Sequence, residues 1–202
     1  MSLTLSDLEI PREVRCFFAL ADDEVFNYGD GCESFDEKGY QVPSTRNVWV
    51  GGNRLAPTLI MVHSVVEAVA MLSINFQRFG SLDNLAVAAL GTRISGEQMD
   101  WIRQTFPGRK IVLAFGNDLA ARITDIKVAA WLQQHYVRIS YQDQLVTISR
   151  NESIHFFDAE SLSLAAYKRI FGIRNNIRTM KPKLFNTFLE QIKYDAAQGH
   201  TY

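Results

Sequence analysis

Three side chains that could carry acid–base or metal chemistry follow apolar runs of the sequence. His63 and Glu67 come after the run 58–62, and Asp118 comes after the run 110–115. Carboxylate oxygens are the ligands that Mg²⁺ and Mn²⁺ prefer, so Glu67 and Asp118 could together hold one weakly bound cation. The imidazole of His63, with an ordinary pKa of about 6.5, could transfer protons. These residues form the candidate catalytic set, with Glu67 and Asp118 as the candidate metal ligands.

Each of the three residues also has a structural explanation. Glu67 stands three residues after Ser64, which is capping-box spacing, and its charge suits the first turn of a helix. Asp118 suits the N-cap of the next helix, a role worth about 1 kcal/mol. A histidine at the end of a strand, like His63, more often has a structural role than a catalytic one. Residue types alone therefore favour a structural site over a metal site.

The elements that must position these residues alternate between strand and helix. The predicted strands are 58–62, 85–90, 110–115 and 136–140. The predicted helices begin at Ser64, Ser95 and Asp118 and end near residues 77, 107 and 134. Apolar strands separated by helices predict parallel pairing, right-handed crossovers and a sheet that is covered on both faces. The expected fold class is therefore α/β.

Shorter elements flank this core on both sides. Residues 1–57 are predicted to form a β-rich extension with strands at 14–20, 39–42 and 47–50. Residues 141–202 are predicted to form a hairpin through 145–157 and two helices near 160–171 and 182–197. We therefore expect three parts: the extension 1–57, an α/β domain at 58–140, and a C-terminal hairpin with helices at 141–202 that packs on it.

Two segments of the middle part resemble the Toprim family. In residues 59–72, an apolar strand leads into His63-Ser64 and then Glu67-Ala68, where the family has Glu-Gly or Glu-Ser and then Asp-Ala. In residues 111–122, a strand leads into Gly116-Asn117-Asp118 and then Ala120-Ala121-Arg122, where the family has Asp-Asn-Asp-x-Ala-Gly-Arg. Residues 89–92 resemble the family's Leu-Gly-Gly turn. The order and spacing of the two segments carry the resemblance, which spans roughly residues 58–140.

The Toprim domain is the metal-dependent domain of primases, topoisomerases, some nucleases and proteins of mobile elements. The resemblance implies a Rossmann-like parallel sheet whose carboxylates hold Mg²⁺ at the ends of the first and third strands, with a glutamate in acid–base work. Here His63 replaces that glutamate and Gly116 replaces one aspartate. Glycine has no ligand, and imidazole suits manganese or zinc better than magnesium. The resemblance therefore implies a degenerate site with at most weak Mg²⁺ or Mn²⁺ binding.

A basic segment lies near the C-terminus. From Lys168 to Lys183 the chain has six bases and no acid, with Tyr167 and Phe171 among them. Cations along one path can contact phosphates, and aromatic rings can stack on unpaired bases. A solvated helix end explains such a segment equally well. The candidate nucleic-acid-binding residues are Lys168, Arg169, Arg174 and Arg178, together with Arg93 and Arg122, which follow predicted strands and are expected to face the same substrate.

The overall composition limits the function only loosely. The net charge of −1 gives no global attraction to nucleic acid or membrane, so any such affinity must be local. The two cysteines, Cys16 and Cys32, have no CxxC spacing, which excludes a cysteine-based zinc site and suits a reducing cytosol. No signal peptide or membrane-spanning run is recognisable. A cytoplasmic location without membrane partners is expected.

Three hypotheses remain open on the sequence. The first is a degenerate Toprim-like protein of a replication, primase or mobile-element context, which binds single-stranded or duplex DNA, or a replication or transfer protein, without full catalysis. The second is an active Mg²⁺- or Mn²⁺-dependent phosphotransferase or nuclease that uses His63, Glu67 and Asp118. The third is a protein-interaction module with no nucleic-acid role, whose acidic residues 1–57 contact a protein partner.

Overall fold

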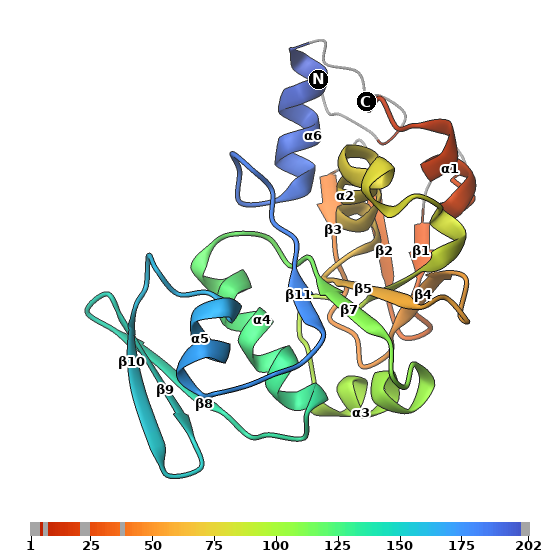
Figure 1. Ribbon diagram of the computed structural model, residues 1–202. Helices are drawn as coiled ribbons and strands as arrows, with labels where there is room; N and C mark the ends of the chain where they lie inside the picture. Colours follow the sequence, from red (N-terminus) through yellow and green to blue (C-terminus); the bar gives the residue numbers. More distant parts are fainter. Residues whose placement is uncertain (1–4, 6–7, 21–24, 37–38, 199–202) are drawn as a thin grey trace.

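The computed structural model describes residues 5, 8–20, 25–36 and 39–198. Its centre is a five-stranded sheet in the order β11-β7-β5-β6-β4 (Figure 1). Four strands run parallel: β5 (Thr58–Val62), β6 (Leu85–Ala89), β7 (Lys110–Leu113) and β11 (Ile177–Thr179). The outer strand β4 (Trp49–Gly52) pairs antiparallel with β6. The chain is therefore of the α/β class, with a mixed sheet that takes a strand from each of the three sequence parts.

The fourth parallel strand is not the one that the sequence predicted. Residues 138–142 form β8 (Arg138–Gln142), which joins β9 (Leu145–Arg150) and β10 (Ser153–Asp158) in a separate antiparallel sheet. The run 136–140 alternates polar and apolar residues, which suits a strand with one solvated face rather than a fully covered strand. The place beside β7 belongs to β11, whose three residues are too few to show a strand period. The prediction of 136–140 as the fourth parallel strand was wrong, whereas the hairpin that β9 and β10 form is confirmed.

The central sheet separates two hydrophobic cores. One face is covered by α1 (Arg12–Phe18), α2 (Val65–Asn75) and α6 (Phe188–Ala197), and the other by α3 (Gly96–Thr105), α4 (Leu119–Leu132) and α5 (Leu164–Ile170) (Figure 1). Alternate side chains of β5 pack into the two cores: Met61 lies in the core beneath α3 and α4, and Ile60 lies in the core beneath α2. Both faces are buried, as the continuous apolar strands predicted.

The predicted helix starts in the middle part are confirmed. The side chains of Ser64, Ser95 and Asp118 accept hydrogen bonds from backbone N–H groups in the first turns of α2, α3 and α4. At Ser95 the full capping box forms. At Ser64 the box is only half formed, because Glu67 donates its backbone N–H to Ser64 but directs its carboxylate elsewhere.

The N-terminal part departs from the prediction at residues 14–20, and it also contains two strands, at 25–27 and 32–36, that were not predicted. Residues 14–20 were expected to form a strand, but they lie largely in α1, which begins after Pro11. The buried residues Val14 and Phe18 stand four apart, which places them on one face of a helix. Three short strands, β1 (Val25–Asn27), β2 (Cys32–Asp36) and β3 (Gly39–Gln41), follow as a small antiparallel sheet.

The last helix begins later than predicted. The sequence suggested 182–197, but α6 begins after Thr187, where Thr187 and Glu190 form a capping box. Residues 181–187 instead pass over the end of β7, where Asn117 donates its backbone N–H to the carbonyl of Asn186 at 2.8 Å. Within the described ranges, no helix is both long and apolar enough to cross a membrane.

Candidate functional site

The two segments that resemble Toprim motifs each pass from strand to helix at the same edge of the central sheet. β5 and β7 are adjacent and parallel, so His63 and Gly116, which follow them, lie at the same carboxyl edge. From β5 the chain passes to β6 on one side and then to β7 on the other, which makes this edge the switch point where open α/β sheets bind ligands. The rings of His63 and Phe115 lie 4.8 Å apart between centroids. We therefore treat this edge as the candidate site.

The imidazole of His63 is half-buried, and burial favours its neutral form. Its Nδ1 lies 3.2 Å from the carbonyl oxygen of Gly91, and a carbonyl can only accept, so Nδ1 carries the proton. Burial lowers the pKa of His63, while the Gly91 carbonyl and the charge of Asp118 act against this and the charge of Lys181 adds to it. Nε2 is therefore the ring nitrogen that can accept a hydrogen bond. The charges of Asp118 and Lys181 both act on the pKa of His63.

The carboxylate of Glu67 is bonded to the N-terminus of α6. Its Oε2 accepts the backbone N–H of Phe188 at 2.9 Å, and its Oε1 accepts that of Leu189 at 3.3 Å. Burial raises the pKa of Glu67 to about 7, although these hydrogen bonds act in the opposite direction. Glu67 thus joins α2 to a helix that begins 121 residues later, and both of its oxygens already have backbone partners.

Asp118 is exposed and caps α4, with Oδ1 2.7 Å from the backbone nitrogen of Ala121. The structure places its charge close enough to act on His63, whereas the carboxylate of Glu67 is turned to α6. Within the described part of the chain, no group of three or more His, Cys, Asp or Glu side chains is arranged to hold a metal ion. The three predicted catalytic residues share one region of the fold without forming one ligand set.

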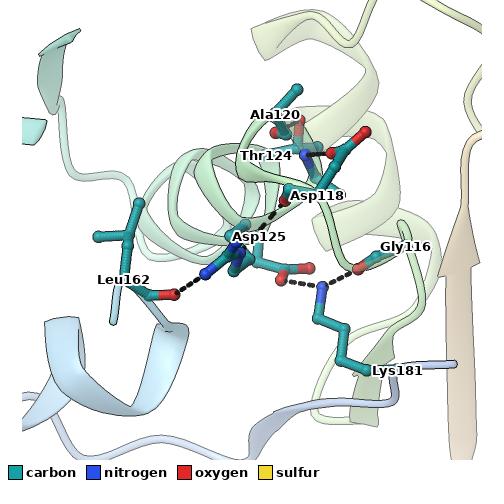
Figure 2. A network of polar contacts seen from close by, with 9 residues as sticks. Gly116, Asp118, Ala120, Thr124, Asp125, Leu162 and Lys181 are labelled. Atoms are coloured by element: carbon teal, nitrogen blue, oxygen red, sulfur yellow. Dashed lines mark hydrogen bonds and ion pairs between the residues drawn. The ribbon is translucent and has the colours of Figure 1, made fainter. Parts of the chain in front are cut away.

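A lysine supplies positive charge at this edge. The ammonium of Lys181 donates to the carbonyl of Gly116 and lies 2.5 Å from Oδ2 of Asp125 on α4 (Figure 2). Asp125 is fully buried, and burial raises its pKa to about 6 while the charge of Lys181 opposes this. The other oxygen of Asp125, Oδ1, has no hydrogen-bond partner among the described residues. A fixed cation therefore lies at the loop where the family's aspartate would stand.

Gly116 is required by the shape of its loop. Its φ of +103° lies in a region that L side chains rarely adopt, and a Cβ there would approach the carbonyl oxygen of Asn186 to 2.6 Å. An aspartate at this position would strain the backbone and collide with residues 181–187. A carboxylate side chain at residue 116 therefore does not fit this loop.

A buried carboxylate that the sequence reasoning missed, Glu33, binds the start of α2. Its oxygens accept the backbone N–H groups of Val65 and Val66, both at 2.8 Å, and the hydroxyl of Tyr28 at 2.7 Å. The hydroxyl of Tyr40 lies between Glu33 and Ser64. Burial raises the pKa of Glu33, and the hydrogen bonds oppose this. The first N–H groups of α2, a common anion-binding position, are therefore satisfied from within the chain.

Weak sequence signals marked two of these missed residues. Glu33 is two residues from the buried Phe35, so strand alternation places it on the inner face of β2. Asp125 stands between Ala121 and Ala129, both buried, at intervals of four along α4. A charged residue in an apolar stripe indicates a buried partner, but it does not identify Lys181, which is far away in sequence.

Two of the six predicted nucleic-acid-binding residues hold loops of the chain itself. The guanidinium of Arg122 donates to the carbonyls of Ala159, Glu160 and Leu162 at 3.2, 2.7 and 3.4 Å. The ammonium of Lys168 donates to the carbonyls of Asn175 and Ile177, both at 3.1 Å. The other four, Arg93, Arg169, Arg174 and Arg178, are exposed.

The exposed bases do not gather at the candidate site. Arg93 follows β6, which places it toward the carboxyl edge of the parallel strands, whereas Arg174 precedes β11, which places it toward the amino edge. Arg93 and the part of the basic segment before β11 therefore lie toward opposite ends of the sheet, whereas Lys181 of the same segment lies at the candidate site. The expectation that the exposed bases face one substrate lacks support from this arrangement.

Comparisons with known proteins add no family. No protein-family model matches the chain, and neither the curated proteins nor the solved structures give a match. The class that the fold defines is a mixed α/β sheet flanked by helices. The Toprim resemblance rests on the residues of the two motifs.

Proposed function

We propose that this protein associates with nucleic acid, in a replication, primase or mobile-element context, without carrying out full Toprim-type catalysis. The observation that supports the lack of full catalysis is the position of Glu67, whose two oxygens accept backbone N–H groups of α6. The carboxylate keeps lone pairs that a metal ion could use, but turning it from α6 toward Asp118 would leave those N–H groups without acceptors, which costs roughly 1–3 kcal/mol for each buried group.

The charges at the site also disfavour the binding of a divalent cation. Mg²⁺ needs several oxygen ligands and is usually bound through one or two carboxylates together with waters and substrate phosphates. Here Gly116 offers no side chain, and the ammonium of Lys181 is bonded to its carbonyl. A divalent cation at this loop would meet a like charge. Any Mg²⁺ or Mn²⁺ binding through Glu67 and Asp118 is therefore expected to be weak.

The nucleic-acid half of the proposal rests on the basic segment. Arg169, Arg174 and Arg178 are exposed, and no acid occurs between Lys168 and Lys183. Cations that are free of acidic neighbours in sequence can release counterions from a phosphate backbone, which gives strongly salt-dependent binding. The proposal places the protein in the cytoplasm, with single-stranded DNA as the first ligand to test and a replication or transfer protein as a further partner.

The test is a salt series on labelled single-stranded and duplex DNA of equal length, measured by fluorescence anisotropy. We expect affinity for the single strand to fall steeply with salt, and neutralising Arg169, Arg174 and Arg178 to glutamine should flatten that dependence. Arg46→Gln, an exposed arginine beside the opposite edge strand β4, is the matched control. Lack of binding at low salt would refute the proposal and favour the protein-interaction module.

The rival active enzyme is tested with the same preparation. A Mg²⁺- or Mn²⁺-dependent phosphotransferase or nuclease using His63, Glu67 and Asp118 should show a metal-dependent rise in melting temperature that disappears in Asp118→Ala. It should also cleave or modify DNA only when the metal is present. Both results together would contradict the non-catalytic half of the proposal.

A further inference from the structure

We infer that a pocket beside the edge strand β11 binds one nucleotide unit of single-stranded nucleic acid. The inference rests on the proposed function and identifies a place where such a strand would be held. The pocket has a volume of about 260 Å³, and its lining includes Thr58, Phe79, Lys110, Val112, Asn176 and Arg178. Four of these six residues come from outside the basic segment of the sequence.

Strand register brings two cations onto one face of the sheet. Arg178 on β11 stands opposite Val112 on β7, and Lys110 precedes Val112 by two residues. Side chains alternate along a strand, so Lys110, Val112 and Arg178 share a face. Val112 packs against the α2-side core, which identifies that face. Strand spacing and rise put the two basic positions roughly 8 Å apart, within reach of one phosphate for such long side chains.

The charge around the pocket is of one sign. Among the residues that the structure describes, no acid lines it, and none lines a second pocket, which is formed by Arg178 together with Lys168, Leu164, Ala165, Ile177 and Thr179. Burial lowers the pKa of Lys168, and the nearby charge of Arg178 adds to this. The local charge thus opposes the net charge of −1 of the whole chain and suits an anion. Because Arg178 lines both pockets, a single strand that runs around β11 can place successive phosphates in the two pockets.

The aromatic and polar lining selects a nucleotide rather than a bare anion. Phe79 ends the short 3₁₀ helix η2 (Phe76–Phe79), is half-buried, and lines the pocket, where it can stack on an unpaired base. The hydroxyl of Thr58 and the amide of Asn176 offer hydrogen bonds to the base or sugar. The pocket is smaller than the roughly 300–1,000 Å³ of sites for drug-sized ligands, so it suits one splayed nucleotide and not a duplex.

The experiment measures binding of a labelled oligo-dT by fluorescence anisotropy over a salt series. Each phosphate contact contributes about 0.7 to the slope of log affinity against log salt for single strands, so Lys110→Gln with Arg178→Gln, which removes both cations from one phosphate, should reduce the slope by about 0.7. Phe79→Leu should weaken binding by roughly 5- to 150-fold, the cost of losing one stacked base. Phe79→Tyr keeps the ring and should bind like the parent protein, as should the control Arg46→Gln.

The outcomes separate this site from the proposed function. If the parent chain binds the strand but the Lys110–Arg178 variant keeps the full salt slope, the pocket is refuted and the proposed function stands. If the parent chain does not bind at low salt, both fail. If inorganic phosphate competes as well as thymidine monophosphate, or if Phe79→Tyr loses binding while it melts at the parent temperature, the base-stacking part is refuted.

Discussion

The ammonium of Lys181 lies 2.5 Å from Oδ2 of Asp125, which is buried on α4 (Figure 2). The pair ties residues 181–187 to a helix on the far face of the sheet and holds them over the end of β7 through the carbonyl of Gly116. A buried ion pair adds little net stability when intact, but loss of one partner leaves an uncompensated charge in a poorly solvated place. The pair therefore determines the shape of the candidate site more than the overall stability.

Lys181→Met is predicted to lower the free energy of unfolding by about 3–5 kcal/mol, because it leaves the Asp125 carboxylate buried and unpaired. The double variant with Asp125→Leu should recover most of that loss. Urea denaturation of the two single variants and the double variant measures the coupling. Losses in the two single variants that simply add in the double variant would show that the pair is not coupled.

Gly116→Asp is predicted to lower the melting temperature without creating a magnesium site. The aspartate would need a φ near +103° and a Cβ 2.6 Å from the carbonyl oxygen of Asn186. Strain of this kind costs on the order of 1–3 kcal/mol. Thermal melting with and without Mg²⁺ and Mn²⁺ is the measurement, and Gly108→Asp, at a φ of +70° with open space around a Cβ, is the control for an aspartate at a positive φ without a collision. A metal-dependent stabilisation specific to Gly116→Asp would show that the loop can hold a metal-binding carboxylate at residue 116.

Glu67 is predicted to make stability fall as pH rises toward 7. Its pKa is raised from 4.5 to about 7 by burial, so in that interval the folded state holds a proton that the unfolded state releases. Its contribution is complete below pH 4.5 and is lost as pH rises through 7, by at most about 1.4 kcal/mol for each pH unit. Denaturant unfolding at pH 5, 6 and 7 should therefore show a smaller fall in Glu67→Gln than in the parent protein.

Burial also raises the pKa of Glu33, with the same sign as Glu67, and the pKa values of Asp125 and His63 are shifted too, so the comparison between variant and parent carries the pH test. Asp125, raised to about 6, has the same sign as Glu67. His63, with a lowered pKa, has the opposite sign, since its contribution is lost as pH falls below 6.5. Parallel curves for Glu67→Gln and the parent protein would contradict the prediction.

Glu33→Ala is predicted to destabilise the chain by roughly 2–5 kcal/mol. It would remove the acceptor from the N–H groups of Val65 and Val66 and from the hydroxyl of Tyr28, and each buried unsatisfied group costs about 1–3 kcal/mol, or about 3–9 kcal/mol for the three. Part of this sum is offset because the variant no longer buries a carboxylate. Urea denaturation measures this, with the exposed Glu13→Ala as the control. A loss below 1 kcal/mol would mean that water replaces the carboxylate at the start of α2.

Local signals in the sequence were sufficient for much of the α/β core. The apolar runs 58–62, 85–90 and 110–115 are β5, β6 and β7, and the hydroxyl or carboxyl caps at Ser64, Ser95 and Asp118 begin the helices that connect or follow them. Such features depend on residues a few positions apart, because strand period and helix capping are short-range effects. The adjacent ends of β5 and β7 follow from the same signals.

The partners of the site residues were beyond the reach of local pattern. Glu67 meets α6, Glu33 meets α2, and Lys181 meets Asp125, each across long stretches of chain. The strand beside β7 is a three-residue segment from the C-terminal part, and it brings Arg178 into one pocket with Lys110. Contacts of this kind arise only when packing closes the chain on itself, because a charge or an unpaired N–H group is satisfied by whichever group the fold brings within hydrogen-bonding distance.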